Sequence, residues 1–380
     1  MNRRRLLATA AAIAAGLETE QAAGAPEALS ALLSRVRREH EVPALASLVM
    51  RDGKVLALAV VGVRKQGDPT PVTVRDRFHL GSCTKAITAA LVGLLVEEKR
   101  LRWELTLAEG FPDLRSTMRP DWRAVTVDHL LQHRSGIPSM SWPKGKTFSD
   151  MHALPGTPRR QRQAYVELIL QEPLDSRPGE KYTYSNANYA LLGALAERVT
   201  DSAWEDLVRN RIYRPLGITT GGFGAMGTAG RVEQPWQHRR STGAYVPIEP
   251  GPRSDNPAVI GPGATAHMAL EDWSRFTGAV LAGAAGRSGL LRAATTAHLV
   301  TPRYGGNYAG GWLVLDRPWA GGRALSHAGS NTQNFCVAWL APLREFMVLV
   351  ATNAGGDDAF PTCDAVAAGA IREFLTQGKV

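Results

Sequence analysis

The sequence predicts an α/β (α+β) fold in which an antiparallel sheet is flanked by terminal helices and carries an inserted helical lobe. Strand-like runs of apolar residues occur near both ends of the chain, at about 45–63 and 310–353. Between them, residues 101–299 show short helical patterns that Pro and Gly interrupt. With 380 residues, 44% of them hydrophobic, the chain is long enough to form two lobes around a sizeable core.

The N-terminal part supplies the first elements of the sheet lobe. Residues 27–40 carry four apolar side chains on one stripe, which is typical of an amphipathic helix. Two strands, about 45–50 and 54–63, follow around an Asp-Gly turn at 52–53, and Asp-Gly between apolar runs is a strong hairpin signal. Residues 84–95 are apolar and rich in Ala and Leu, so we expect a buried helix there.

The C-terminal part supplies the remaining strands and a closing helix. A helical pattern covers about 359–376, and four preceding stretches read as strands: GGWLVLD, ALSHAG, NFCVAWLAP and FMVLVATN. We therefore predict one domain over residues 26–380, with an α/β lobe of about 26–100 and 300–380 and a helical lobe of about 101–299. A cleft between two such lobes is the expected place for a site.

The first 25 residues read as an export signal rather than as part of the fold. Three arginines at 3–5 precede an Ala-rich apolar run, and small residues at 22–25 offer a cleavage site. NRRRLL resembles a twin-arginine (Tat) signal, and an ordinary secretory signal or an uncleaved anchor stays open as the alternative. Beyond this segment no apolar run reaches the roughly 18–20 residues of a spanning helix. We expect a periplasmic or secreted protein whose mature chain has no membrane span.

Charge and composition exclude several classes of partner. The formal net charge of +9 becomes +8 without residues 1–25, which favours weak association with an anionic cell envelope. No helix-turn-helix, zinc finger or base-stacking module is present, so nucleic acid is excluded as a partner. The G-x-G-x-x-G match at 222–227 lacks the preceding strand and following helix of a nucleotide site. No nucleotide cofactor is therefore expected at this match.

Neither the histidines nor the cysteines form a metal-binding pattern. His129 and His133 stand four residues apart, but HLLQH lacks the glutamate that metalloproteases place after the first histidine. The cysteines, Cys83, Cys336 and Cys363, lack C-x-x-C spacing, so no metal site is expected. A disulfide between Cys336 and Cys363 and buried free thiols are both open.

The stretch HLGSCTKAI, residues 79–87, places two candidate nucleophiles side by side. If a helix begins near Ser82, Lys85 lies one turn further along the same face, whereas Cys83 points elsewhere. A serine hydroxyl needs a base, and burial lowers the pKa of a lysine enough to make it one. A helix N-terminus also presents free backbone N–H groups to a developing oxyanion. Ser82 is therefore the predicted nucleophile.

A lone S-x-x-K is a weak signal, and the chain contains a second one. Ser141 and Lys144 have the same spacing, but a nearby proline and glycine leave no helix to align them, so we expect a loop. No G-x-S-x-G occurs, which excludes the nucleophile elbow of α/β-hydrolases. Two distant motifs strengthen the first S-x-x-K, namely Y-S-N at 184–186 and H-A-G at 327–329.

Three motifs in this order resemble the serine β-lactamase and penicillin-binding-protein family, in its class C β-lactamase, esterase and D-aminopeptidase branch. The surrounding stretches LLQHRSGIP, PGEKYTYSNANYALLG and GPGATAHMALEDWSRF are similar as well, and the resemblance extends from about residue 28 to the C-terminus. It implies a β-lactamase/transpeptidase-like fold and hydrolysis through an acyl-enzyme, without metal or cofactor.

The resemblance also implies a role for each residue of the first two motifs. Ser82 matches the acylated nucleophile, and Lys85 matches its proton-accepting partner. Tyr184 matches the second member of the base system. Asn186 matches the side chain that holds Lys85 and the substrate amide.

The third motif supplies the other side of the implied site. The backbone N–H groups of Ser82 and Ser330 match the oxyanion hole, and the missing side chain at Gly329 lets a substrate lie against the strand edge. His327 matches the lead residue, but lactamases and transpeptidases usually have lysine there. A permanent cation suits a substrate carboxylate, whereas a histidine is largely neutral near pH 7.

We therefore expect an exported serine hydrolase that acts on a small ester, amide or peptide, with esterase or aminopeptidase-like activity favoured. A β-lactamase or D-alanyl-D-alanine carboxypeptidase is the alternative among enzymes. A non-catalytic envelope protein that binds or senses peptidoglycan fragments is the alternative from another class. Specificity is expected to come from loops at 140–160 and 220–260.

Overall fold

The computed structural model of the chain describes residues 25–139 and 142–376. Most of the predicted export signal, and Ser141 of the second S-x-x-K, lie outside these residues. The first described residue begins helix α2 (Ala25–His40), at the place where the sequence predicts a helix. Within the described ranges, no helix combines the length and the hydropathy that crossing a membrane requires.

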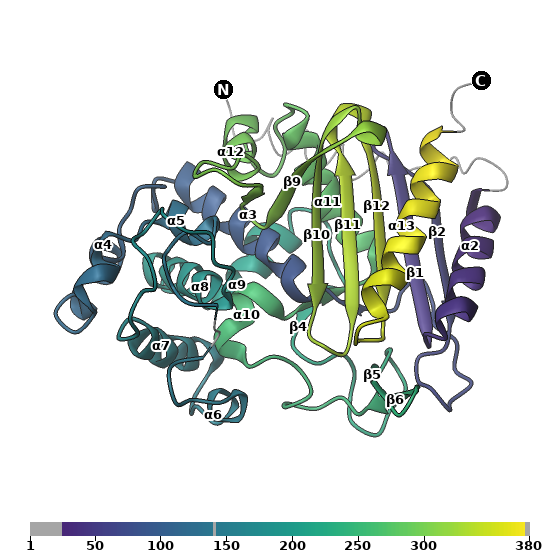
Figure 1. Cartoon of the computed structure of the whole chain (residues 1–380), viewed down its shortest axis with the longest axis horizontal. Helices are drawn as coiled ribbons and strands as arrows, with labels where there is room; N and C mark the ends of the chain where they lie inside the picture. The colour runs from purple at the N-terminus through teal and green to yellow at the C-terminus, as the bar shows by residue number, and fades with distance from the viewer. Residues whose placement is uncertain (1–24, 140–141, 377–380) are drawn as a thin grey trace.

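A seven-stranded antiparallel sheet has the strand order β2-β1-β12-β11-β10-β9-β8 (Figure 1). Strands β1 and β12 pair with Leu48 opposite Leu349, so the two ends of the chain build one sheet. The β1–β2 hairpin turns at Asp52 and Gly53, which both have positive φ, as the Asp-Gly signal predicts. The strands are β1 (Ala44–Arg51), β2 (Lys54–Gly62), β8 (Tyr308–Ala309), β9 (Trp312–Arg317), β10 (Gly322–Ser330), β11 (Phe335–Ala341) and β12 (Phe346–Thr352).

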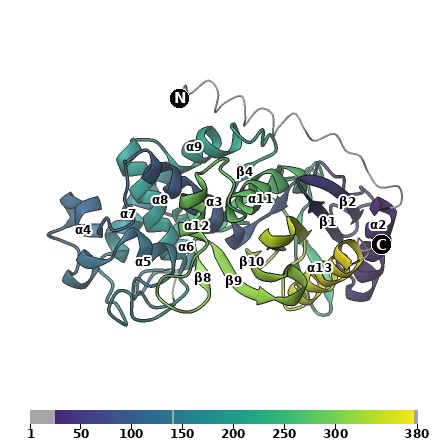
Figure 2. The same cartoon turned by 90° about the horizontal axis from the view of Figure 1, so that it is seen from above.

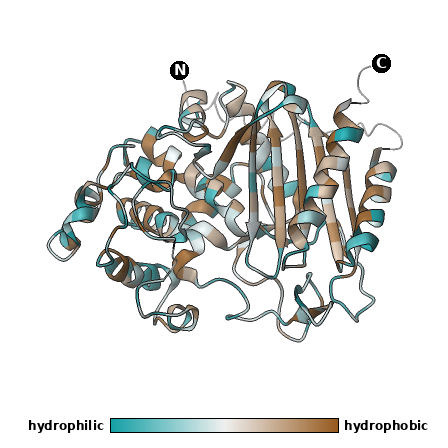
Figure 3. Ribbon diagram, in the orientation of Figure 1, coloured by the Kyte–Doolittle hydropathy of each residue, from teal (hydrophilic) through white to brown (hydrophobic). Residues whose placement is uncertain are grey.

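Helices cover both faces of this sheet. Helices α2 and α13 (Ala359–Thr376) lie on one face, and α11 (Leu270–Ala284) lies on the other (Figure 2). The strands therefore bury apolar residues on both sides, which gives two cores and the brown segments along the strands in Figure 3. Thr277 Oγ1 of α11 lies 3.3 Å from Met347 Sδ of β12, so α11 packs on the sheet although the sequence assigned its segment to the helical lobe. The predicted fold class is confirmed.

Two buried helices, α3 (Thr84–Glu97) and α8 (Asn186–Thr200), pack against each other and carry the first two motifs at their N-termini. Arg162 of α7 (Pro158–Ile169) is fully buried and pairs with Glu197 and Glu205, which fixes α8 against its neighbours. Six shorter helices surround them: α4 (Leu107–Gly110), α5 (Val127–Leu131), α6 (Phe148–His152), α9 (Trp204–Val208), α10 (Gly261–Ala264) and α12 (Ala293–Leu299).

The segment that the sequence predicts as helical also contains short strands. They are β4 (Gly222–Phe223), β5 (Gln237–Ser241), β6 (Ala244–Ile248) and β7 (Ala266–Met268). Strands β4 and β7, of two and three residues, are too short to show an alternating pattern in a sequence. Strands β5 and β6 have five residues each, and β5, with the sequence QHRRS, contains no β-branched or aromatic residue that would indicate a strand. Strand β7 pairs with β3 (Phe78–His79), so this small sheet holds the start of the turn at residues 81–83. This turn carries the predicted nucleophile, Ser82, and is called the nucleophile turn below.

All three cysteines are buried and free. Cys336 of β11 lies in the core on the α11 side of the sheet, whereas Cys363 of α13 lies in the core on the opposite side. The sheet separates the two sulfur atoms. Of the two alternatives that the sequence leaves open, the structure therefore has the free thiols.

Candidate active site

Ser82 lies in a tight turn between β3 and α3. Residues 81–83 form one 3₁₀ turn, and α3 begins at Thr84. Gly81 has a φ of +47°, and a Cβ at this position would lie 2.3 Å from the backbone nitrogen of Ser330. A residue with a side chain could not let the turn approach β10 this closely. The turn places Ser82 at the N-terminal end of a buried helix.

Lys85 is the buried neighbour of Ser82. Its Nζ lies 3.2 Å from Ser82 Oγ, 2.7 Å from Asn186 Oδ1 and 2.9 Å from the carbonyl oxygen of Gly263. The side chain is fully buried. Burial lowers the pKa of Lys85 from 10.5 to about 7, because desolvation disfavours the ammonium form.

The neighbours of Lys85 decide where its lone pair points. Carbonyl oxygens only accept hydrogen bonds, so Asn186 Oδ1 and the Gly263 oxygen each take an N–H group of the lysine. A neutral amine has two N–H groups and one lone pair. The lone pair is left for the third neighbour, Ser82 Oγ, where it can accept the hydroxyl proton.

Tyr184 contacts Ser82 from the start of α8. Its hydroxyl donates to Ser82 Oγ at 2.7 Å. Ser185 is the N-cap of α8, so one helix start fixes both Tyr184 and Asn186. Burial raises the pKa of Tyr184 well above that of a free tyrosine. Near neutral pH the phenol therefore keeps its proton, and Lys85 is the group with a free lone pair.

His133 holds Tyr184 in place, although the sequence singled it out only as a rejected zinc ligand. The ring centroids of the two residues are 4.4 Å apart. The His133 carbonyl oxygen accepts from Thr183 N at 2.9 Å, and its Nδ1 accepts from Ser185 N at 3.3 Å, so both neighbours of Tyr184 are tied to it. Burial lowers the pKa of His133 well below its ordinary value and keeps the ring neutral. Its left-handed backbone, with a φ of +54°, is a feature that no sequence signal reveals.

His129 has a different structural role. Its Nδ1 accepts a hydrogen bond from Thr126 N at 3.1 Å, and His129 N donates to Thr126 Oγ1, which together cap α5. The i, i+4 histidine pair is therefore explained by a helix cap and by the support of Tyr184.

His327 of β10 is buried beside the site and is not a solvent-exposed strand residue. It is 5% exposed, and its Nε2 lies 3.4 Å from the hydroxyl of Tyr308. Burial, assisted by the nearby Lys85, lowers the pKa of His327 to about 3. Near neutral pH the lead residue of the third motif therefore offers a hydrogen bond and no charge.

Gly329 is required by a contact that the sequence did not predict. A Cβ there would lie 1.9 Å from the carbonyl oxygen of Leu80 and 3.0 Å from the backbone nitrogen of Cys83. The missing side chain thus makes room for the turn at residues 81–83, and its expected role in letting a substrate lie against the strand edge stays a prediction. Because the turn and β10 touch, the backbone N–H groups of Ser82 and Ser330 belong to two segments in direct contact.

The end of β10 leaves one edge open near the nucleophile turn. β10 pairs with β11 as far as Ser330, but with β9 only as far as Ser326. Residues 327–330 therefore extend beyond the paired part of β9. An open strand edge presents backbone groups that an extended ligand can bind.

Cys83 points away from Ser82 and toward the sheet. Its Sγ lies 3.5 Å from the carbonyl oxygen of His327 and 3.7 Å from Cys336 Sγ. Burial raises the pKa of the Cys336 thiol well above its usual range, which disfavours the reactive thiolate. The two thiols fill the contact between the nucleophile turn and the sheet.

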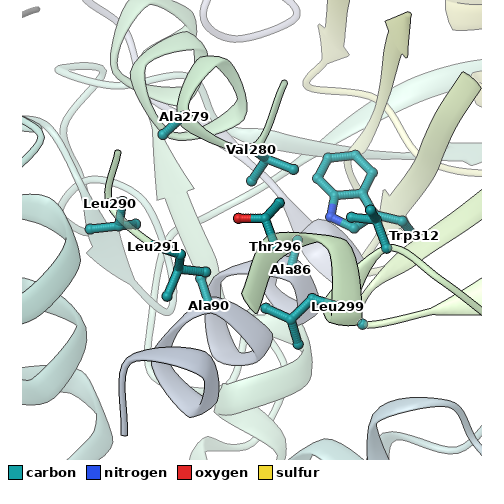
Figure 4. A pocket seen from close by; sticks show the side chains of 11 residues that line it. Ala86, Ala90, Ala279, Val280, Leu290, Leu291, Thr296, Leu299 and Trp312 are labelled. Atoms are coloured by element: carbon teal, nitrogen blue, oxygen red, sulfur yellow. The ribbon is translucent and has the colours of Figure 1, made fainter. Parts of the chain in front are cut away.

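The cavity shown in Figure 4 is not part of this site. Mostly apolar side chains from α3, α11, α12 and the start of β9 line it, and its volume is about 20 Å³. That space holds about one water molecule. None of the predicted site residues lines it, which are Ser82, Lys85, Tyr184, Asn186, His327, Gly329 and Ser330.

Comparison with known proteins identifies the family. A family model described as Beta-lactamase matches residues 18–371. The chain belongs to the beta-lactamase family. Members of this family are serine hydrolases, so the predicted resemblance and the prediction of an enzyme are confirmed. The chain is 27% identical over 339 residues to penicillin-binding protein 4 of Amycolatopsis lactamdurans, which covers 86% of this chain and 85% of that protein.

Solved structures of the same fold include an amidase and a second hydrolase. D-amino acid amidase from Ochrobactrum anthropi SV3, complexed with L-phenylalanine amide, has a TM-score of 0.70 and 20% identity, and the match covers 91% of this chain and 96% of that one. EstCE1, described as a hydrolase with promiscuous acyltransferase activity, has a TM-score of 0.73 and 18% identity, with 90% and 98% covered. At these identities the likeness establishes the β-lactamase-type fold of this family member.

Proposed function

We propose that this beta-lactamase-family protein is an exported serine hydrolase that cleaves an ester or amide through an acyl-Ser82 intermediate. The observation that carries the proposal is the position of Ser82 Oγ, 3.2 Å from Lys85 Nζ and 2.7 Å from the Tyr184 hydroxyl. A base and a proton donor thus meet at one hydroxyl group, and acyl transfer to serine requires both.

Acylation begins when the lone pair of Lys85 takes the proton of Ser82 while Oγ attacks the substrate carbonyl carbon. The carbonyl oxygen becomes an oxyanion, and the backbone N–H groups of Ser82 and Ser330 bind it. As the C–O or C–N bond breaks, Tyr184 gives its proton to the leaving group and regains one from the Lys85 ammonium. Asn186, 2.7 Å from Lys85 Nζ, keeps the amine in this geometry and is proposed to contact the substrate amide.

Deacylation repeats the sequence with water as the nucleophile. The Lys85–Tyr184 pair accepts a proton from water as it attacks the acyl carbon, and the ester bond to Ser82 breaks with return of a proton to Oγ. The product leaves as a carboxylic acid. Each proton transfer in the cycle passes through Lys85, Tyr184 or Ser82.

The preferred substrates are proposed to be short acyl esters, or amides with no carboxylate beside the scissile bond. The neutral, buried His327 supports this choice, because it holds no charge that could pair with a carboxylate near neutral pH. The amidase and EstCE1 among the structural neighbours are consistent with ester or amide chemistry on this fold.

A β-lactamase or D-alanyl-D-alanine carboxypeptidase is the second candidate, favoured by the match to a penicillin-binding protein over 86% of the chain. A fluorophosphonate probe and a fluorescent penicillin distinguish the candidates on purified protein. Labelling by the fluorophosphonate with ester turnover supports the main proposal, and faster labelling by the penicillin supports the second candidate. A binding or sensing protein without catalysis reacts with neither probe.

Export to the periplasm or medium is part of the proposal because of the N-terminal arginines. Weak association with anionic envelope polymers is part of it because the chain without residues 1–25 has a net charge of +8. Lysines in place of the arginines at 3–5 should block delivery by the twin-arginine route. Unchanged export from cells that lack the Tat machinery would show that the arginines belong to an ordinary secretory signal.

A further inference from the structure

A buried carboxylate, Asp255, lies behind the nucleophile turn. Asp255 is 5% exposed and belongs to the loop before α10. Its Oδ2 lies 2.9 Å from His79 Nε2, and its Oδ1 accepts from Asn331 Nδ2 at 2.9 Å. Each carboxylate oxygen thus holds a different segment of the chain. His79 comes three residues before Ser82, and Asn331 directly follows Ser330.

His79 connects one side of this contact to the nucleophile turn. The backbone N–H of Gly81 donates to His79 Nδ1 at 3.0 Å. Nδ1 can accept only when it carries no proton, so the ring proton is on Nε2, where it faces Asp255. The orientation of the peptide before Ser82 therefore depends on a ring that Asp255 holds.

Asn331 connects the other side to the end of β10. Its Oδ1 accepts from the backbone nitrogens of Gln333 at 3.2 Å and Asn334 at 3.0 Å, which fixes the turn after Ser330. Its Nδ2 donates to Asp255 and to Gln237 Oε1. Asn331 is 7% exposed, so these bonds are shielded from water and cannot be replaced by it at no cost.

We propose that Asp255 is a positioning residue that sets the separation between the two oxyanion N–H groups, those of Ser82 and Ser330. The inference rests on the proposed function, because an oxyanion hole acts only if Ser82 is acylated. Asp255 acts through His79 and Asn331 and touches neither substrate nor reacting atoms. The segment from His79 to Ser82 and the segment from Ser330 to Asn331 are the two arms held by Asp255. They are in contact at Gly81 and Ser330, so a shift of either arm alters the spacing of the two backbone N–H donors.

The substitution Asp255→Asn tests this role with little change of shape. A carboxylate accepts hydrogen bonds at both oxygens, whereas an amide accepts at one side and donates at the other. The new NH₂ group must face the N–H of either His79 or Asn331, and one arm loses its anchor. His79 cannot accept instead, because moving its proton to Nδ1 would place it against the Gly81 N–H.

We expect Asp255→Asn to weaken the stabilisation of the transition state and to leave substrate binding nearly unchanged. Misplacing an oxyanion donor should lower kcat for a nitrophenyl ester by about 10²-fold and leave KM within about threefold. The affinity for phenylboronic acid, whose adduct with Ser82 carries a negative oxygen, should fall by a similar factor. Asn331→Ala removes the other arm and should act in the same direction, so the test does not depend on one variant that fails to fold.

Asp272→Asn is the matched control. Asp272 is also 5% exposed and accepts hydrogen bonds from the backbone nitrogens of Thr219 and Thr220, and these bonds reach neither His79 nor Asn331. It should lower the melting temperature without changing kcat per folded molecule. If Asp255→Asn behaves like this control, with kcat of the folded fraction within threefold of the natural enzyme, the positioning role is refuted.

Hydrogen exchange separates this inference from the proposed function. In Asp255→Asn, peptides that span residues 78–83 and 327–334 should exchange faster than in the natural protein, whereas Asp272→Asn should leave both unchanged. If the natural protein neither hydrolyses esters nor labels at Ser82, the proposed function fails, and this measurement still decides whether Asp255 bridges the two segments. Unchanged exchange in both peptides would overturn the bridge.

Discussion

Burial of Lys85 should cost folding stability in a way that depends on pH. Lys85→Met replaces the buried amine with an apolar chain of similar length. In the unfolded chain the lysine keeps its ordinary pKa of 10.5, whereas in the folded protein the pKa is about 7. Between these values the unfolded state binds more protons, so the stability of the natural protein rises with pH through this window.

The size of the effect follows from the two pKa values. At pH 7 the burial of an otherwise charged lysine costs about 4 kcal/mol relative to an uncharged residue, and at pH 10 it costs about 1 kcal/mol. The stability gained by Lys85→Met should therefore be about 3 kcal/mol larger at pH 7 than at pH 10. The bonds that Lys85 makes to Asn186 and Gly263 are lost at both pH values and largely cancel in this difference.

Urea unfolding of both proteins at the two pH values measures the quantity directly. Lys146→Met, at an exposed lysine, is the control and should change the free energy of unfolding by the same amount at pH 7 and at pH 10. If Lys85→Met changes stability by the same amount at pH 7 and pH 10, Lys85 keeps an ordinary pKa in the folded protein. Its proposed role as a neutral base near pH 7 would then be wrong.

Three further outcomes concern activity. The kcat/KM for a nitrophenyl ester should rise with pH and level off above about pH 7, because only neutral Lys85 has a lone pair. A kcat/KM that does not change with pH around pH 7 would exclude Lys85 as the base. Tyr184→Phe should lower turnover by about 10²–10⁴-fold, because the serine oxygen and the leaving group lose their proton donor. Near-normal turnover in this variant would exclude Tyr184 as the proton donor. His327→Lys should shift the ratio of kcat/KM values from the nitrophenyl ester toward a chromogenic cephalosporin, because the new cation can pair with a carboxylate. A natural enzyme that already prefers the cephalosporin by a wide margin contradicts the substrate proposal.

The sequence predicted the parts of the site that depend on local geometry. Ser82 and Lys85 lie on one helical turn, so their spacing in the sequence determines that they meet, and the structure places them 3.2 Å apart. The strands at both chain ends were equally visible, because β1 and β12 are long apolar runs between turn signals. The family motifs then indicated which distant residues to examine, and the structure brings Tyr184 and Asn186 to the same place.

The remaining parts of the site depend on contacts between segments that are distant in the sequence. Such contacts cannot be predicted from a single sequence. The Gly263 oxygen binds Lys85 across 178 residues, and Asp255 meets His79 across 176. His133 looked like half of a rejected metal pair, because its left-handed backbone and its ring contact with Tyr184 have no signature in the sequence. Gly329 was recognised as necessary, but the partner that requires it, Leu80, could only be seen in three dimensions.

The central claim is that Ser82, and not its neighbour Cys83, is the residue that becomes acylated. Fluorophosphonate labelling of the purified protein, with the modified residue mapped by peptide mass spectrometry, tests it most directly. A single adduct on Ser82 is expected, with labelling and ester hydrolysis lost in Ser82→Ala and largely retained in Cys83→Ala. An adduct on Cys83, or hydrolysis that survives in Ser82→Ala and disappears in Cys83→Ala, would contradict the mechanism.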